Sequence, residues 1–157
     1  MLFLSPTSPP LMEFPGIRSG SELSSLLIQI GSASKSDFQP SPLEPTWILE
    51  GNPIARSLPL AASADGQFTC GRWECTGGRF NFTYACDEIV QILEGSVTIE
   101  EAGVERTLRA GDVAFFPQGL TALWTVHGYV KKFAIFRSKQ RSFLSRVRGK
   151  LKRLLGR

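Results

Sequence analysis

The sequence predicts an all-β domain, either a closed barrel or a sandwich, from three observations. Gly and Pro together account for 25 of the 157 residues and separate short apolar runs from one another. Several of these runs alternate apolar and polar residues at period two, which is typical of strands. Helical periodicity is nearly absent between the two ends of the chain. Strands spaced this closely remove their exposed edges when they close into a barrel.

Residues 1–45 are expected to form an extension outside the barrel. Pro and Ser dominate the stretches SPTSPP and KSDFQPSPLEP, a composition typical of flexible connections. Between them, Ser19 and Glu22 have the spacing of a capping box, and Gly31 follows an apolar run. These signals predict a short helix over 21–30, although the run LLIQI is also compatible with a strand.

Residues 46–137 carry strand signals in close succession. The stretches TWILEG and ARSLPLAAS come first, and Asp65-Gly66 then predicts a hairpin turn. The stretch QFTCGRWEC is the next expected strand. Gly77-Gly78 is expected to end it.

The second half of this region continues the series with eight or more short strands in total. RFNFTY places three rings on one face at period two, and EIVQILEG is expected to end in a turn at Gly95. Ala102-Gly103 predicts the next hairpin, and Pro117 ends the strand GDVAFF because proline cannot donate to a ladder. His127 is expected in a turn after the strand ALWTV. The three rings are Phe80, Phe82 and Tyr84.

Two spacings in this region resemble the motifs of the cupins, which are double-stranded β-helix barrels of the jelly-roll type. Six residues separate Glu88 from Gly95, and five separate Gly111 from the segment 117–119, which reads Pro-Gln-Gly. Flanking residues are similar to those of the small single-domain cupins grouped with the ureidoglycine aminohydrolase cupin domain. The resemblance covers about 46–136 and rests on Trp73, Asp87-Glu88, Trp124 and Lys131-Lys132.

The resemblance implies a metal centre, but its histidine positions hold other residues. Those of the first motif fall on Phe82 and Tyr84, or on Asn81 and Thr83 in the longer variant, and that of the second motif falls on Ala122. A catalytic iron, manganese or zinc ion needs three or four converging ligands. Glu88 supplies one. The sequence therefore predicts a barrel with no metal and no other cofactor.

Glu88 has two interpretations. It is either a ligand-binding or proton-transferring acid in an aromatic-lined barrel mouth, with Tyr84 as a catalytic helper, or a buried structural acid paired with a base. The candidate bases are Arg72, Arg79 and Lys132. Lys132 is also a candidate for anion binding, and otherwise the solvated end of a strand.

The aromatic residues also have two interpretations. Trp73, Phe82 and Trp124 are candidates for lining a small-molecule pocket, and the same rings would fill the interior of a small barrel. Tyr84 and Trp124 each have a polar tip that needs a partner.

The C-terminal segment 138–157 is predicted to be a basic amphipathic helix. From Arg137 to Arg157 there are nine Lys/Arg and no Asp/Glu, so the rest of the chain has a net charge of −5. Apolar residues recur in this segment at helical spacing. Three roles remain open for it: binding an anionic membrane surface, packing on the barrel or a partner subunit, and, least favoured, contacting nucleic acid.

The cysteines and the first residues favour a cytoplasmic protein. If the tail binds lipid, the protein is also expected at a membrane surface. Cys70, Cys75 and Cys86 fit neither a disulfide framework nor a standard zinc site. MLFLSPTSPP lacks the basic start of a secretory signal. The leading functional hypothesis is a metal-independent cupin that binds a small polar molecule, and the resemblance implies a homodimer. The alternatives are a hydrolase or isomerase acting on a small nitrogen-containing or sugar substrate, and a non-enzymatic scaffold targeted by its tail.

Overall fold

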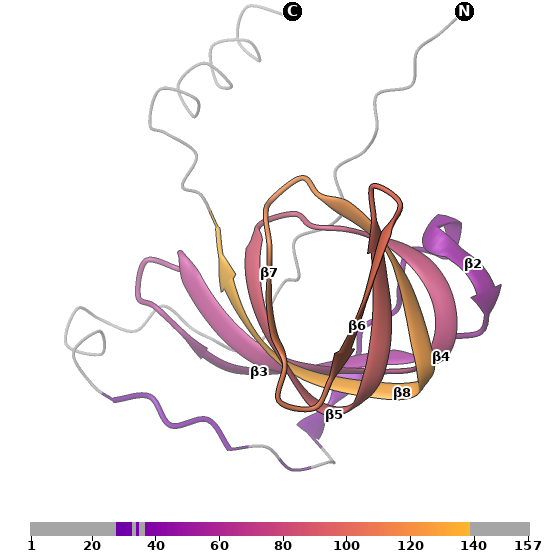
Figure 1. Cartoon of the computed structure of the whole chain (residues 1–157). Helices are drawn as coiled ribbons and strands as arrows, with labels where there is room; N and C mark the ends of the chain where they lie inside the picture. Colours follow the sequence, from indigo (N-terminus) through magenta and orange to yellow (C-terminus); the bar gives the residue numbers. More distant parts are fainter. Residues whose placement is uncertain (1–27, 33, 35–36, 139–157) are drawn as a thin grey trace, which may run out of the picture.

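The computed structural model describes residues 28–32, 34 and 37–138, and almost all regular structure in this part of the chain is β. The strands curl around one common interior (Figure 1). This confirms the predicted all-β jelly-roll class. One 3-10 turn, η3 (Pro45–Trp47), accompanies the strands β1 (Gln39–Pro40), β2 (Ile48–Gly51), β3 (Ala55–Ala62), β4 (Phe68–Thr83), β5 (Asp87–Glu101), β6 (Val104–Arg109), β7 (Val113–Phe116) and β8 (Thr121–Arg137).

Three long strands form the framework of the sheet. The strand order is β1-β3-β4-β8-β5-β6, and all pairs are antiparallel. β8 lies between β4 and β5 over nearly its whole length, while β2 pairs with one end of β4 and β7 with one end of β5. Each long strand therefore contributes to both halves of the roll.

Two predicted hairpin turns are confirmed. Asp65-Gly66 lies between β3 and β4, and Ala102-Gly103 lies between β5 and β6. Ala102 and Gly103 have φ angles of 50° and 77°, which is the backbone required at the centre of a type I′ turn. β7 ends at Phe116, directly before Pro117, as predicted.

The expected strand ends at Gly77-Gly78, at Gly95 and around His127 are wrong. β4 continues past the first pair, β5 continues past Gly95, and His127 lies within β8, where its Nε2 is 2.8 Å from Thr98 Oγ1. The strand register shifts near both glycine positions instead. These glycines permit a bulge and a bend, where the sequence alone suggests a chain reversal.

The bulges also change which residues face the interior. Glu88, Val90 and Ile92 point inward before Gly95, whereas Val97 and Ile99 point inward after it, so the inward parity changes from even to odd numbers. β4 changes parity in the same way between Trp73 and Phe82, which are nine residues apart. Both of these rings consequently face the same interior.

The barrel interior is apolar and dominated by rings. Phe80, Tyr84 and Trp124 are almost completely buried, and Trp124 contacts the rings of both Phe80 and Phe82 at centroid distances of about 6 Å. The interior therefore excludes water around any polar group placed within it.

Among the described residues no helix combines the length and the apolar composition of a membrane span.

The sheet begins earlier than the predicted barrel boundary. β1 pairs with β3, and Phe38 and Leu43 are buried. These residues lie within the segment expected to be an extension. Most of the helix predicted over 21–30 lies outside the described residues, and residues 28–30 belong to no helix or strand. The amphipathic helix predicted over 138–157 also lies outside them, apart from Ser138.

Gly95 is expected to be the more sensitive of two glycines that have nearly the same backbone conformation. Its φ is 74°, and a β-carbon there would overlap the carbonyl oxygen of Tyr129. Gly103 has a φ of 77° but no atom within 4 Å of the corresponding position. We expect Gly95→Ala to lower the free energy of unfolding by more than about 3 kcal/mol and Gly103→Ala by only about 1 kcal/mol. Denaturant unfolding measures both, and equal losses would contradict the close approach of β5 and β8.

Candidate functional site

A pocket in the barrel interior contains a buried ion pair. The Nζ atom of Lys132 on β8 lies 2.7 Å from Oε1 of Glu88 on β5, and the two side chains are only 4% and 3% exposed. The space in it that a water-sized molecule can enter is small, about 20 Å³, roughly the room of one water. Its lining residues come from β3, β4, β5 and β8: Ser57, Leu58, Gly71, Arg72, Trp73, Phe82, Glu88, Lys132, Ala134 and Phe136.

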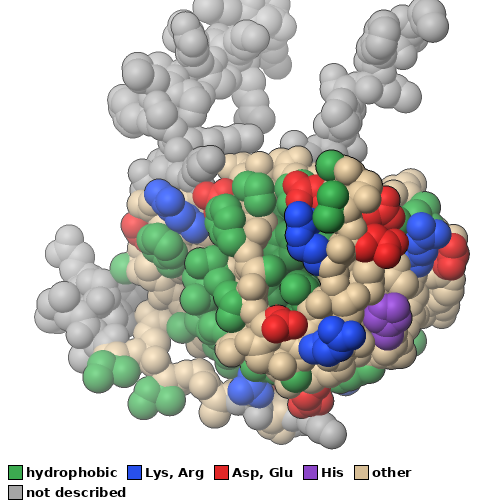
Figure 2. Space-filling model, in the orientation of Figure 1, with side chains coloured by type: hydrophobic (Ala, Val, Ile, Leu, Met, Phe, Trp, Pro, Cys, Tyr) green, Lys and Arg blue, Asp and Glu red, His purple; other side chains and the backbone are tan. Residues whose placement is uncertain are grey.

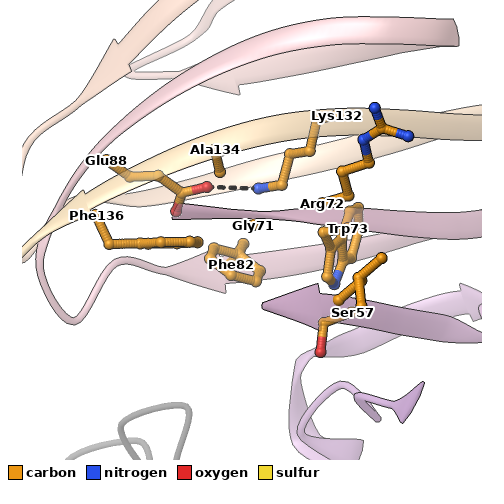
Figure 3. Close-up of a pocket in the computed structure, with 10 residues that line it drawn as sticks. Ser57, Gly71, Arg72, Trp73, Phe82, Glu88, Lys132, Ala134 and Phe136 are labelled. Atoms are coloured by element: carbon orange, nitrogen blue, oxygen red, sulfur yellow. Dashed lines mark hydrogen bonds and ion pairs between the residues drawn. The ribbon is translucent and has the colours of Figure 1, made fainter. Parts of the chain in front are cut away.

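Strand register explains why these two charged side chains meet. Glu88 pairs with Phe136 on β8, and Lys132 pairs with Ile92 on β5, four residues along the same inward face. Lys132 extends along β8 toward Glu88 (Figure 3). The structure thus selects Lys132 among the three bases proposed for Glu88. Arg79 instead forms an exposed ion pair with Glu50 at 3.0 Å, and the guanidinium of Arg72 points away from the carboxylate (Figure 3).

Three aromatic rings surround the Lys132 ammonium. Its Nζ lies 4.9 Å from the ring centroid of Trp73, 5.5 Å from that of Phe82 and 4.8 Å from that of Trp124. A cation within about 6 Å of a ring face is attracted by the quadrupole of the ring, most strongly where water is excluded. The rings and the carboxylate together offset the cost of burying the ammonium.

Tyr84 lies beside the ion pair but is not among the residues that line the pocket. Its hydroxyl accepts a hydrogen bond from Trp124 Nε1 at 3.1 Å, and its ring stacks on Phe116 at a centroid distance of 4.6 Å. Burial raises the pKa of Tyr84 well above its ordinary value, and the nearby Glu88 charge raises it further. The phenol is therefore neutral at physiological pH. The catalytic role suggested for Tyr84 and Glu88 stays a prediction.

The structure brings together most of the residues singled out from the sequence. Trp73, Phe82, Glu88 and Lys132 line one pocket, and Trp124 lies behind it against the ammonium. Phe136 also lines the pocket and is not among the residues that the sequence predicts, although alternation along β8 could have identified it, since it follows Lys132 and Ala134 on the same face. Ser57 and Leu58 are likewise unpredicted, because their strand carries no distinctive pattern.

Comparison with protein families identifies the domain. Residues 62–134 match the model of the EutQ-like cupin domain family, somewhat less than half of the chain. The chain contains a cupin domain. A search of the curated proteins found no match.

Three solved structures illustrate the similarity. A DUF861-family protein of unknown function from Pseudomonas syringae pv. tomato has 30% identity and a TM-score of 0.58, with the alignment covering 62% of this chain and 43% of that one. The EutQ protein of Clostridium difficile has 20% identity and a TM-score of 0.50, with the alignment covering 56% of this chain and 65% of that one. A DUF861-family protein of Thermotoga maritima has 34% identity and a TM-score of 0.39, with the alignment covering 40% of this chain and 73% of that one. The chain thus spans less than two thirds of the length of the first two proteins.

The residues of this cupin domain do not fit the metal centre that the family resemblance implies. Phe82 and Ala122 have no donor atom, and the Tyr84 hydroxyl is engaged by Trp124. No group of three His, Cys, Asp or Glu side chains in the described part of the chain could hold an ion. The Lys132 ammonium, moreover, already neutralises Glu88 and would repel a cation there.

The cysteines of the cupin domain do not supply the missing ligands. Burial raises the pKa of the Cys75 thiol to about 12 and that of Cys86 to about 11, and the Glu88 charge contributes to the second shift. Thiols bind metals as thiolates, and these two remain protonated at neutral pH. Both cysteines therefore act as small apolar side chains.

We expect two neighbouring lysines of the cupin domain to differ in their contribution to stability. Lys132→Met leaves the buried Glu88 carboxylate without a counter-ion, a loss that typically costs about 3–5 kcal/mol. Lys131 pairs with Glu94 at the same distance, 2.7 Å, but Glu94 is 58% exposed and stays hydrated, so Lys131→Met should cost about 1 kcal/mol or less. Urea unfolding at pH 7 measures both variants. A loss for Lys132→Met as small as that for Lys131→Met would contradict the buried pair.

Proposed function

We propose that this protein is a metal-independent cupin that binds a small polar molecule in the pocket formed by Trp73, Phe82, Glu88 and Lys132. The observation that carries the proposal is the position of the ion pair. Buried charges require hydrogen-bonding partners, and this pair borders a small internal space whose other lining side chains are mainly apolar. A purely structural barrel would be served as well by apolar side chains of the same volume.

A binding experiment tests the proposal directly. The chain has three tryptophans, of which Trp73 and Trp124 contact the Lys132 ammonium, so their indole N–H signals in nuclear magnetic resonance report on the pocket. We expect a screen of amides, amino acids, sugars and carboxylates to contain molecules that shift these two signals at submillimolar to millimolar concentration. The third indole, that of Trp47, contacts Phe82 at a centroid distance of 5.4 Å, so its signal is followed together with the other two.

The control variants separate pocket binding from surface binding. The double variant Glu88→Gln/Lys132→Met removes both charges together and leaves no unpaired ion, so it should remain folded and lose the binding. Lys131→Met, which changes the adjacent lysine outside the pocket, should retain it. A screen without binders, or binders that are insensitive to the double variant, would count against the proposal.

We further propose that the protein forms a homodimer, as the family resemblance implies, through the outer face of β7, β5 and β8. In one row across these strands Phe115 pairs with Ile89 and Ile89 pairs with Ile135, and these side chains are 60%, 46% and 37% exposed. Hydrophobic side chains gather on the side of the barrel where β7 lies (Figure 2). A contiguous exposed apolar patch of this kind is typical of a protein–protein contact, and a second copy presents the same flat row.

The mass in solution tests the dimer. We expect light scattering to give twice the chain mass of 17.3 kDa for the wild type and the single mass for Phe115→Glu, because a charge within the row cannot be solvated in the interface. Val104→Glu places the same charge on an exposed apolar residue of β6, outside the row, and should leave the dimer intact. A single-chain mass for the wild type would refute this assembly.

A further inference from the structure

The apolar row on the outer face of the sheet continues across β4 and β3 with smaller side chains. Cys70 of β4 pairs with Ile135, and Ala61 of β3 pairs with Cys70, so both lie on the same face as Ile135. The row therefore has two unequal halves. Its large half consists of Phe115, Ile89 and Ile135 on β7, β5 and β8, and its small half lies on β4 and β3.

The segment 28–30, which we call the arm, extends the small half of the row past the edge of β3. The side-chain amide of Gln29 donates to the carbonyl oxygen of Ala62 at 2.9 Å and accepts from its N–H at 3.2 Å, much as a neighbouring strand would pair. Ile28 and Ile30 on either side are 90% and 88% exposed, the highest values among the large apolar side chains of the described residues. The arm therefore holds two large apolar side chains that make little contact with their own barrel.

Two copies can stack through this face in two simple symmetric ways. Sheets that pack face to face lie about 10 Å apart, and a two-fold axis that exchanges them lies in the plane between them. An axis parallel to the row places every residue over its own copy, with large side chains over large ones and small over small. An axis parallel to the strands, between β4 and β8, reverses the row and places each large side chain over a small one.

From these sizes we infer that the dimer has its two-fold axis along the strands, between β4 and β8, so that the arm of each copy covers β7 of the other. Ile135 then packs over Cys70 of the partner subunit, and Ile89 packs over the partner's Ala61. Phe115 meets the partner's arm. The row-parallel axis would hold the sheets apart at the large half and leave voids over the small half, which well-packed interfaces avoid. The inference rests on the proposed dimer and specifies its symmetry and its contacts.

The rows on either side of the apolar row accept the strand-parallel axis without opposing like charges. Phe68 pairs with Arg137 across β4 and β8, and Arg72 pairs with Phe133. Rotation about an axis along these strands keeps the height of each residue, so each arginine comes to lie over an aromatic ring of the second copy. A guanidinium over a ring is a favourable contact.

Thiol cross-linking distinguishes the two axes. Within one copy Ala61 and Ile89 are three strand spacings apart, about 14 Å, whereas the strand-parallel axis places them over one another in the dimer. In a Cys70→Ser/Cys86→Ser background, a bis-maleimide too short to span that distance is added to the dimer. We expect Ala61→Cys/Ile89→Cys to give about fivefold or more covalent dimer than either single cysteine variant. The remaining cysteine, Cys75, is buried and does not compete.

A double-mutant cycle tests the contact of the arm. Ile28→Ser/Ile30→Ser and Phe115→Ala should each raise the dissociation constant of the dimer, as measured by sedimentation equilibrium. Combined, they should raise it by less than the product of the two factors, because both remove the same contact. Leu49→Ser/Ile54→Ser changes two exposed apolar residues on and beside β2, outside the row, and should leave the constant unchanged.

The outcomes distinguish this inference from the dimer on which it rests. A single-chain mass for the wild type would remove the dimer itself. Equal cross-linking of the Ile89→Cys variant alone would show the row-parallel axis, and a dimer in which no variant cross-links would use another face. Both results overturn the inference and leave a dimer in place. If the cysteine substitutions prevent dimerisation, the cycle decides, since a full product of the two factors would contradict the contact between the arm and Phe115.

Discussion

The ammonium of Lys132, held between the Glu88 carboxylate and three aromatic rings, is the constraint on which the interior of this barrel depends. Burying two charges costs several kcal/mol each, by order of magnitude, and this is offset only where the geometry is good. Here a charge-assisted hydrogen bond of 2.7 Å and ring centroids at 4.8–5.5 Å supply that geometry. The identity of each neighbouring residue is thereby restricted, since a smaller ring or a shorter acid would leave the charge without its partners.

The backbone reaches this arrangement through bends in its longest strands. Trp73 and Phe82 are nine residues apart on β4, and in a regular strand they would face opposite sides of the sheet. The bulge near Gly77 and Gly78 changes the parity, so both rings approach the same ammonium. Close packing of backbones maintains the bend, because a β-carbon at Gly77 would lie 3.2 Å from the Cα of Gly128 on β8. The glycines far from the pocket thus position its walls.

This geometry explains which features could be predicted from the sequence. Strand positions and hairpin turns follow from alternation and from residues such as Asp65-Gly66, whose preference is local. A glycine with positive φ, however, suits a bulge as well as a chain reversal, and the partner strand decides between them. The sequence therefore predicts a turn at Gly95, where the structure has a bulge within β5. Strand alternation disfavours Arg72 as the partner of Glu88, because Arg72 is adjacent to the inward-facing Trp73 and so points outward. The choice of Lys132 additionally depends on the register of β5 against β8.

Replacing a metal ion by a tethered ammonium changes what a cupin pocket can recognise. A bound divalent ion attracts anionic ligands, because its protein ligands leave positive charge uncompensated at the open coordination position. The Lys132 ammonium is fully matched by one carboxylate, and it presents protons along defined directions. Because the pair carries no net charge, it does not exert the attraction that a bound metal ion exerts on anionic ligands.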